Sequence, residues 1–425
     1  MTTTSKSLSF LYRLRSGAFR STTMKTLLIF IGVDGGVASV LLRLRDLVTA
    51  VLVCAPLAAL AQVTIEAVPE SKPSVETQSL ASLLEQAMQG SKTPALGALV
   101  MQDGKITQSA VRGVRRNDRP QAVLDTDVWL IGSTAKPMTV ALIAKLVDRG
   151  VLAWDKTLAQ MLPTLSAGMH PQYRDVTLLQ LVSHQSGLPR DITNRMTVAA
   201  FFADKRPLPL QRLAYTKAAL KEKPVSARGA PGNYCNTGFV IAALIAEQSM
   251  GRDFENLMQS EVFLPLDIRS ANFGTTNDGQ VRGHRAGKPF VRAPKKDADG
   301  VPMVYTAAGY VTISLHDWAL FCLDQMAGIH GGGKLLKPES YRLMQTAQAG
   351  GQSGVDWGIQ ESIAGRKGPV LLHGGSDGNW LAWVALFPDS RSGVLVITNA
   401  ADDMDGDKVS KAVLGGVLPQ LSTAK

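Results

Sequence analysis

Stretches with strand-type patterns lie near both ends of the chain, and stretches with helix-type patterns occupy the middle. The segment 95–114 consists of two apolar runs around Asp103-Gly104, a dipeptide typical of the tight turn in a β-hairpin. After residue 350, short apolar runs again alternate with turn residues, and a helix pattern covers 407–421. We therefore predict an α+β fold of the α/β sandwich type. It has an antiparallel sheet built from both ends of the domain, flanked by helices, with an inserted mainly helical lobe.

The pattern from residue 133 to about residue 325 is mainly helical. Apolar residues recur at helical spacing in the segments 79–88, 138–150, 176–189 and 236–251. Gly150 suits the end of the second segment, because glycine readily adopts the left-handed conformation that follows many helices. We assign residues 78–420 to one domain.

Residues 1–61 have the features of a targeting segment. Basic residues precede an apolar run over 47–60, and the small residues Ala59 and Ala61 suit a cleavage site before Gln62. We predict an N-terminal extension with a secretory signal over 1–61, a linker over 62–77, and a periplasmic or secreted mature protein. The alternatives are a retained membrane anchor, a lipidated Cys54, and a start at Met24.

The charge of the chain says little about its partners. Half of the formal net charge of +10 lies within residues 1–61, so the basic excess of the remainder is mild. Because no basic run is interleaved with aromatic residues, we expect no nucleic-acid partner. We also expect no membrane span after removal of the signal.

The mature chain keeps Cys235 and Cys322, which we predict to be buried free thiols, with one disulfide as the alternative.

A serine followed three residues later by a lysine is a known nucleophile pattern, and it occurs twice. One copy is Ser133 with Lys136, and the other is Ser422 with Lys425. Ser422 is close to the C-terminus, where chains are often poorly ordered. Ser133 instead precedes a helix pattern with Pro137, a residue tolerated only in the first helical turn, so the helix should begin near Ser133. We therefore choose Ser133 as the nucleophile.

The position of Ser133 suits this role in two ways. Free N–H groups at a helix start favour the negative charge that develops on an activated oxygen. Lys136 lies three residues further along the same helix face, within reach of Ser133. In a dry site the charged form of a lysine is disfavoured, so Lys136 can share or accept a proton.

Two further motifs offer partners for Ser133. Tyr234 and Asn236 follow a Pro-Gly turn and precede a helix pattern. His373, Gly374 and Gly375 follow an apolar run, and paired glycines let a backbone approach a substrate closely. Taken alone, the first motif is better explained as a turn with a capping asparagine, and the second as a turn at a strand end with a hydrogen-bonded histidine.

In this order, the motifs "GSTAK", "YCN" and "HGG" resemble those of the serine β-lactamase and penicillin-binding-protein superfamily. The resemblance covers about residues 78–420 and is greatest to the class C β-lactamase-like and esterase branch. It implies that Ser133 is acylated and that Lys136 and Tyr234 manage its proton, with Tyr234 as a phenolate-like base.

The resemblance also assigns substrate-binding residues. It implies that Asn236 orients the substrate and Lys136, and that His373, Gly375 and Ser376 line the substrate. The N–H groups of Ser133 and Ser376 would form the oxyanion hole. The family motif usually begins with lysine where this chain has His373, and a neutral imidazole offers less positive charge to a substrate carboxylate.

The sequence therefore predicts a secreted serine hydrolase that acts on ester or amide groups of a small-molecule or peptide substrate. The alternatives are a true class C-like β-lactamase or D,D-peptidase, and a module that is acylated without turnover. We expect no cofactor, and no metal because the six histidines lack ligand spacing. His184 is expected to be structural.

Overall fold

The computed structural model describes residues 29–33, 36–40 and 78–422, apart from residues 275, 277–278, 291–301, 349–350 and 352. The chain divides into two units, Met1–Leu57 and Ala58–Lys425. In the first unit, β1 (Ile29–Val33) pairs antiparallel with β2 (Gly36–Val40). The predicted signal cleavage site, Cys54 and the linker 62–77 lie outside the described residues. No helix in the described part of the chain is long and apolar enough to cross a membrane.

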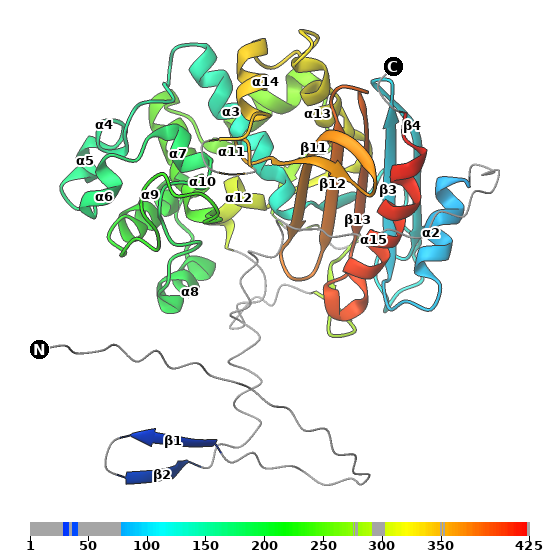
Figure 1. Ribbon diagram of the computed structural model, residues 1–425, viewed down its shortest axis with the longest axis horizontal. Helices are drawn as coiled ribbons and strands as arrows, with labels where there is room; N and C mark the ends of the chain where they lie inside the picture. The colour runs from blue at the N-terminus through cyan, green and yellow to red at the C-terminus, as the bar shows by residue number, and fades with distance from the viewer. Residues whose placement is uncertain are drawn as a thin grey trace, which may run out of the picture. The chain divides into compact units, whose positions relative to one another are not determined.

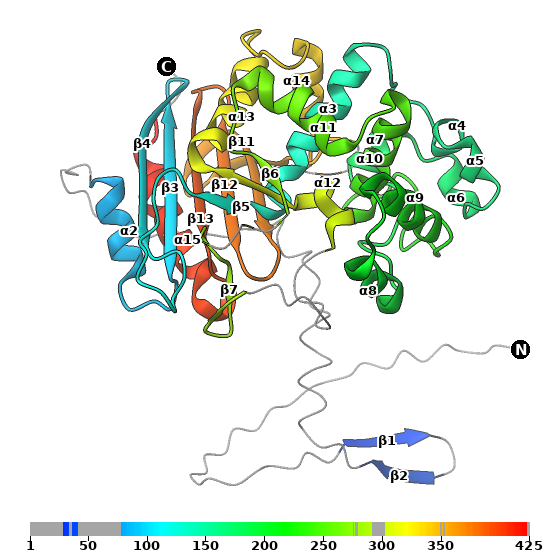
Figure 2. The same cartoon turned by 180° about the vertical axis from the view of Figure 1, so that it is seen from behind.

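The second unit is built on a six-stranded antiparallel sheet with the strand order β10-β11-β12-β13-β3-β4 (Figures 1 and 2). Its strands are β3 (Ala95–Gln102), β4 (Lys105–Gly113), β10 (Gly358–Ile363), β11 (Arg366–Ser376), β12 (Leu381–Phe387) and β13 (Ser392–Thr398). Strand β13 pairs with β3, so the two ends of the domain meet in the middle of the sheet. The predicted fold class is thereby confirmed.

The predicted hairpin is present at the turn between β3 and β4. Asp103 and Gly104 both have positive φ, of 51° and 75°. A two-residue turn with positive φ at both positions matches the twist of the strands that it joins.

Alternate residues of the central strands enter two separate cores. In β3, Leu96, Ala98 and Val100 pack with α2 (Leu80–Met88) and α15 (Gly406–Val417). Leu99 and Met101 of the same strand enter the larger core on the opposite face. This two-residue alternation is the reason that the sheet needs helices on both faces.

The larger core includes the helical lobe, whose helices come between β4 and β10 in the chain and lie to one side of the main sheet (Figure 2). Its helices and those nearby are α3 (Lys136–Asp148), α4 (Leu158–Met161), α5 (Pro163–Ser166), α6 (Pro171–Arg174), α7 (Leu178–Val182), α8 (Arg195–Ala203), α9 (Leu208–Ala219), α10 (Asn236–Met250), α11 (Phe254–Met258), α12 (Thr306–Gly309), α13 (Leu315–Gly328) and α14 (Pro338–Met344). Small sheets are formed by β5 (Val128–Leu130), β9 (Val311–Ser314) and β6 (Asn272–Phe273), and by β7 (His284–Arg285) and β8 (Lys288–Pro289).

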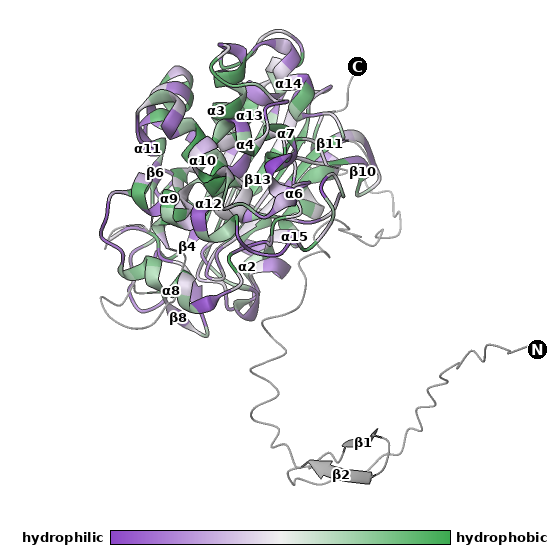
Figure 3. Ribbon diagram, turned by 90° about the vertical axis from the view of Figure 1, so that its left-hand side faces the viewer, coloured by the Kyte–Doolittle hydropathy of each residue, from purple (hydrophilic) through white to green (hydrophobic). Residues whose placement is uncertain are grey.

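Helices α3 and α10 are buried on nearly all sides, and the hydropathy colouring of Figure 3 shows their apolar character. Gly150 and Gly251, which follow these helices, have φ of 72° and 65°. These left-handed glycines end α3 and α10 close to the predicted positions. The predicted helix over 176–189 is wrong in length, because α7 ends at Val182. His184 then adopts a φ of 60°, which a right-handed helix cannot contain.

A buried ion-pair network holds α12 against the lobe. Arg212 on α9 is fully buried and binds Glu247 and Glu255 at 2.7 Å each. Its guanidinium also donates to Thr306 Oγ1, at the start of α12, at 3.0 Å. A buried arginine is tolerated because its donors meet these acceptors in good geometry. The network thereby positions the Ala308 carbonyl oxygen of α12, which contacts Lys136.

Candidate active site

Ser133 lies in a tight 3-10 turn, Gly132–Ala135, between β5 and α3. Ile131 joins the end of β5 to this turn, and its N–H donates to Val311 O of β9 at 3.1 Å. Lys136 is the first residue of α3, and Pro137 follows it in the first turn. The predicted helix start is therefore placed three residues too early, because the backbone first makes a 3-10 turn. The effect is the predicted one: Ser133 stands at the entrance of a buried helix.

The third motif packs directly against this turn. His373, Gly374 and Gly375 lie within β11 and pair with β12, so their predicted position after a strand is wrong. A Cβ atom on Gly375 would come within 2.8 Å of the Ser133 nitrogen. A Cβ on Gly132 would come within 2.6 Å of the Ser376 nitrogen. Only glycine allows this approach, which brings the backbone nitrogens of Ser133 and Ser376 to one place.

Lys136 is fully buried beside Ser133. Its Nζ donates to Ser133 Oγ at 3.0 Å and to the carbonyl oxygen of Ala308 on α12. Burial lowers the pKa of Lys136 to about 8, although the negative charge of Asp356 acts in the opposite direction. At this pKa the neutral amine is accessible near physiological pH, so Lys136 can accept the serine proton.

Tyr234 covers Lys136 from the other side. The Lys136 Nζ lies 4.8 Å from the centre of the Tyr234 ring. The Tyr234 hydroxyl is buried and has no hydrogen-bond partner among the described residues. The Ser133 hydroxyl is nevertheless near enough to act on Tyr234 and to favour a lower pKa. Burial and the charge of Asp356 raise the pKa of Tyr234 far above its usual value. Tyr234 is therefore a neutral phenol at rest, and the electrostatics favour Lys136 over the expected phenolate as the proton acceptor.

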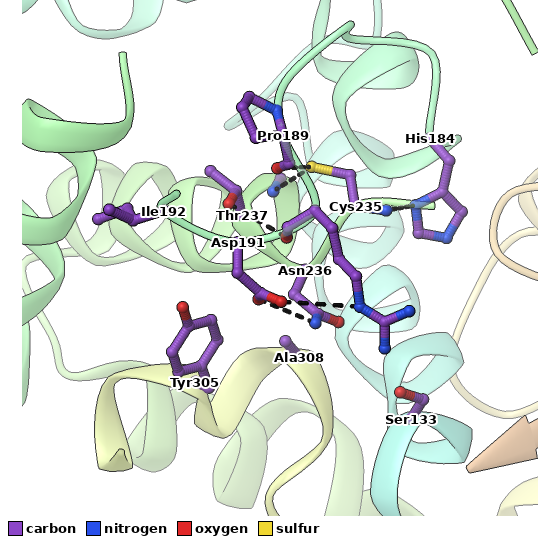
Figure 4. A network of polar contacts seen from close by, with 12 residues as sticks. Ser133, His184, Pro189, Asp191, Ile192, Cys235, Asn236, Thr237, Tyr305 and Ala308 are labelled. Atoms are coloured by element: carbon purple, nitrogen blue, oxygen red, sulfur yellow. Dashed lines mark hydrogen bonds and ion pairs between the residues drawn. The ribbon is translucent and has the colours of Figure 1, made fainter. Parts of the chain in front are cut away.

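Asn236 is the first residue of α10. Its Nδ2 donates to Asp191 Oδ1 at 3.0 Å, and Figure 4 shows the two side chains joined. The contact with Lys136 that the family resemblance implies does not appear among the described residues. Asp191 instead fixes the amide, leaving the Asn236 carbonyl oxygen as the group able to meet a substrate.

Two residues that the sequence did not assign to the site link its parts. Nε2 of His184 donates to Asp356 Oδ1 at 2.9 Å, and Nδ1 accepts from the Cys235 N–H at 3.0 Å. His373 Nε2 lies 3.3 Å from Asp356 Oδ2. The sequence predicts a structural role for His184. It contains no motif around Asp356 that would assign this residue to the site.

The second Ser-x-x-Lys copy makes different contacts. Ser422 Oγ donates to Gln102 Oε1 at 2.7 Å, and the Ser422 carbonyl accepts from Ser392 at 3.2 Å. Ser422 is thus held against the sheet, contrary to the expectation that this end of the chain is poorly ordered. Lys425 lies outside the described residues. The described contacts of the Ser422 hydroxyl include no amine placed as Lys136 is placed beside Ser133.

The two cysteines of the predicted mature chain are both free and buried. Cys235 Sγ donates to the Pro189 carbonyl at 3.3 Å and accepts from the Gly238 N–H. Burial raises the pKa of the Cys235 thiol to about 12. Cys235 therefore stays a neutral thiol and serves to cap α10 between Tyr234 and Asn236.

Comparison with known proteins agrees with this geometry. The family described as Beta-lactamase matches residues 80–416. "Protein flp" of Staphylococcus aureus (strain COL) is 21% identical over 327 residues, which are 76% of this chain and 63% of flp. The chain thus spans less than two thirds of the length of flp. "Penicillin-binding protein 4" of Amycolatopsis lactamdurans is 25% identical over 324 residues, 72% of this chain and 81% of that protein.

Solved structures show the same fold at low sequence identity. The octameric penicillin-binding protein homologue from Pyrococcus abyssi has a TM-score of 0.63 at 20% identity, covering 81% of this chain and 77% of that one. SurE has a TM-score of 0.64 at 21% identity, covering 80% and 75%. The chain therefore belongs to the Beta-lactamase family, within the superfamily of serine β-lactamases and penicillin-binding proteins.

Proposed function

We propose that this protein is a serine hydrolase that forms an acyl-enzyme on Ser133 and acts on ester or amide groups. The single observation that carries the proposal is the contact of 3.0 Å between Ser133 Oγ and the buried amine of Lys136. A serine hydroxyl is a weak nucleophile until a base removes its proton. Lys136, with a pKa of about 8, supplies a base of suitable strength at the required position.

In the proposed reaction, neutral Lys136 takes the Ser133 proton as Oγ attacks the substrate carbonyl. The negative oxygen of the tetrahedral intermediate is placed against the N–H groups of Ser133 and Ser376. When the bond to the leaving group breaks, the proton on Lys136 passes to that group, directly or through the Tyr234 hydroxyl. Water then attacks the ester on Ser133 and gives a proton to Lys136. As the bond to Ser133 Oγ breaks, Lys136 passes this proton to that oxygen, and the acid product is released.

The environment of His373 supports a preference for substrates without a carboxylate. Its Nε2 faces Asp356, and its Nδ1 lies 2.9 Å from the Gly374 carbonyl oxygen. Both ring nitrogens are therefore turned to protein acceptors, and neither is presented to a substrate. The family motif usually continues with threonine where this chain has Gly374. A Cβ at this position would meet the Trp383 ring at 3.0 Å, so a threonine here would be crowded.

We expect a short-chain p-nitrophenyl ester to be hydrolysed more efficiently than a chromogenic cephalosporin. A hydrogen bond to a charged group contributes about 1.5–3 kcal/mol, so its loss weakens selection for carboxylate-bearing lactams about ten- to a hundredfold. The measurement is kcat/KM for p-nitrophenyl butyrate, the matched hemisuccinate ester and the cephalosporin. The butyrate should be the best substrate of the three.

A strong preference for the cephalosporin would replace this proposal by the β-lactamase alternative. A preference for D-amino-acid peptides would support the D,D-peptidase alternative. Stoichiometric acylation without turnover of any of these compounds would indicate a module that is acylated and then stays so.

We also propose that the protein acts in the periplasm or outside the cell, because residues 1–61 have the pattern of an export signal. The protein recovered from its native host should begin at or near Gln62 and be found outside the cytosol. Intact-mass measurement and N-terminal sequencing test this expectation. A full-length chain in the cytosol would contradict it.

A further inference from the structure

Asp356 occupies a position that is costly for an aspartate in two respects. It lies in the loop between α14 and β10 with a φ of 71°, in the left-handed region where glycine is favoured. Its side chain is also fully buried, with no exposed area. A strained backbone and a buried carboxylate persist only where the surrounding contacts hold them, and such positions are concentrated at functional sites.

The carboxylate of Asp356 connects two parts of the fold that meet at Ser133. On one side it accepts from His184, which follows α7 in the helical lobe, at 2.9 Å. On the other side it faces His373 of β11 in the main sheet at 3.3 Å. The bridge His184–Asp356–His373 therefore runs from the lobe to the sheet.

The protons of the bridge are fixed by its neighbours. His184 Nδ1 accepts from the Cys235 N–H, so its ring proton is on Nε2 and is donated to Asp356. The His184 ring also packs on Tyr234, with ring centres 4.5 Å apart and planes inclined by 31°. Asp356 therefore fixes the orientation of His184, and His184 in turn contacts the Cys235 N–H and the Tyr234 ring.

We propose that Asp356 is a positioning residue of the hydrolase, whose carboxylate clamps His184 and His373 and thereby fixes Tyr234 and the third motif around Ser133. This inference rests on the proposed hydrolase function and adds a residue to it. Asp356 makes no direct contact with Ser133 or Lys136 among the described contacts, so it acts through the two histidines and through its charge.

The charge of Asp356 has a consequence that can be measured. Burial favours the neutral acid, but the interactions with His373 and His184 outweigh it, so the pKa of Asp356 lies below its usual value. The carboxylate is therefore ionised and raises the pKa of Lys136 against the effect of burial. The other charged groups that act on Lys136 are Arg190 and Asp191. Burial lowers the pKa of His184, and Lys136 and His373 act in the same direction.

Loss of the Asp356 charge should consequently lower the pKa of Lys136 further. If neutral Lys136 is the base, kcat/KM rises with pH as Lys136 loses its proton. Without Asp356 this rise should occur at lower pH, by roughly half to one pH unit for one nearby charge. A residue that is merely structural would lower activity at every pH and leave the position of the rise unchanged.

Two substitutions separate the charge of Asp356 from its hydrogen bond with His184. Asp356→Asn removes the charge and keeps an oxygen that can accept from His184. Asp356→Gly removes both and suits the positive φ. We expect both variants to shift the pH profile for p-nitrophenyl butyrate to lower pH. Only Asp356→Gly should also lose about tenfold or more in the plateau value of kcat/KM, within the range for a misplaced catalytic group.

Asp324→Asn is the matched control. Asp324 is also a buried aspartate, and it accepts from the Tyr341 hydroxyl at 2.6 Å and from the Lys334 N–H. Because Asp324 belongs to α13 and its contacts do not include the site, its variant should keep the wild-type pH profile. An unshifted profile in both Asp356 variants would overturn the inference.

The outcomes distinguish this inference from the proposed function. A wild-type enzyme that hydrolyses no ester or amide contradicts both, whereas an active wild type with unshifted Asp356 variants contradicts the Asp356 role alone. If neither variant folds, ¹⁵N-histidine NMR of the wild-type protein provides the test. His184 should carry its proton on Nε2, and a proton on Nδ1 would overturn the bridge.

Discussion

Replacement of Ser133 by alanine should reduce kcat for every hydrolysed substrate by about 10⁶-fold, the loss seen when the nucleophile is removed from a comparable serine enzyme. The reason is local. Ser133 Oγ is the group that Lys136 contacts at 3.0 Å, and alanine leaves this base with nothing to activate. The change removes one oxygen atom from a tight turn, so the thermal unfolding temperature should stay close to that of the wild type. Steady-state kinetics with p-nitrophenyl butyrate provide the measurement.

Ser422→Ala is the control for the other Ser-x-x-Lys copy. This substitution removes the hydrogen bond to Gln102 and no group near the nucleophile, so kcat/KM should remain within about twofold of wild type. Normal rates in Ser133→Ala, or an inactive Ser422→Ala that is correctly folded, would mean that the nucleophile has been assigned to the wrong copy.

Replacement of Lys136 should have the second largest effect. Lys136→Met keeps an unbranched apolar stem but loses the amine, and we expect a fall in kcat/KM of roughly 10²–10⁴-fold, the usual contribution of a general base. Lys136→Arg should be equally impaired, because a guanidinium keeps its proton and cannot act as a base. An active arginine variant would show that Lys136 contributes only its charge.

The pH dependence of the wild type tests the same point. Burial lowers the pKa of Lys136 to about 8, so the base is protonated below this pH and neutral above it. The value of kcat/KM for an uncharged ester should rise with pH through about 8 in the wild type and lose this rise in Lys136→Met. Lys145→Met is the matched control on α3, since Lys145 pairs with Glu261 at 3.3 Å and should leave the profile unchanged.

Local signals in the sequence were sufficient to predict the frame of the fold, and they led to the proposal of Ser133 as the nucleophile. The Asp103-Gly104 turn and the change of period after residue 350 predicted a sheet built from both ends. The position of Pro137 placed Ser133 at a helix entrance. Each of these features depends on neighbouring residues, and neighbouring residues are visible in a sequence.

Features that depend on distant residues could not be predicted in this way. Strand β11 contains three glycines and a proline, and it becomes a strand because β10 and β12 pair with it on both sides. The neutral state of Tyr234 and the lowered pKa of Lys136 both follow from burial, which only the assembled lobe and sheet produce. The proposed role of Asp356 depends on two histidines from other parts of the chain. His184 is separated from it by 172 residues, and His373 lies on β11.

The most direct test of the account is to trap the acyl-enzyme and locate it. The folded protein should be incubated with an alkyl fluorophosphonate, and its intact mass measured before and after reaction. We predict one covalent adduct per chain, found by peptide mapping on Ser133 and absent from the Ser133→Ala variant. An unmodified protein, or an adduct on Ser422 with Ser133 unmodified, would contradict the assignment of Ser133 as the nucleophile.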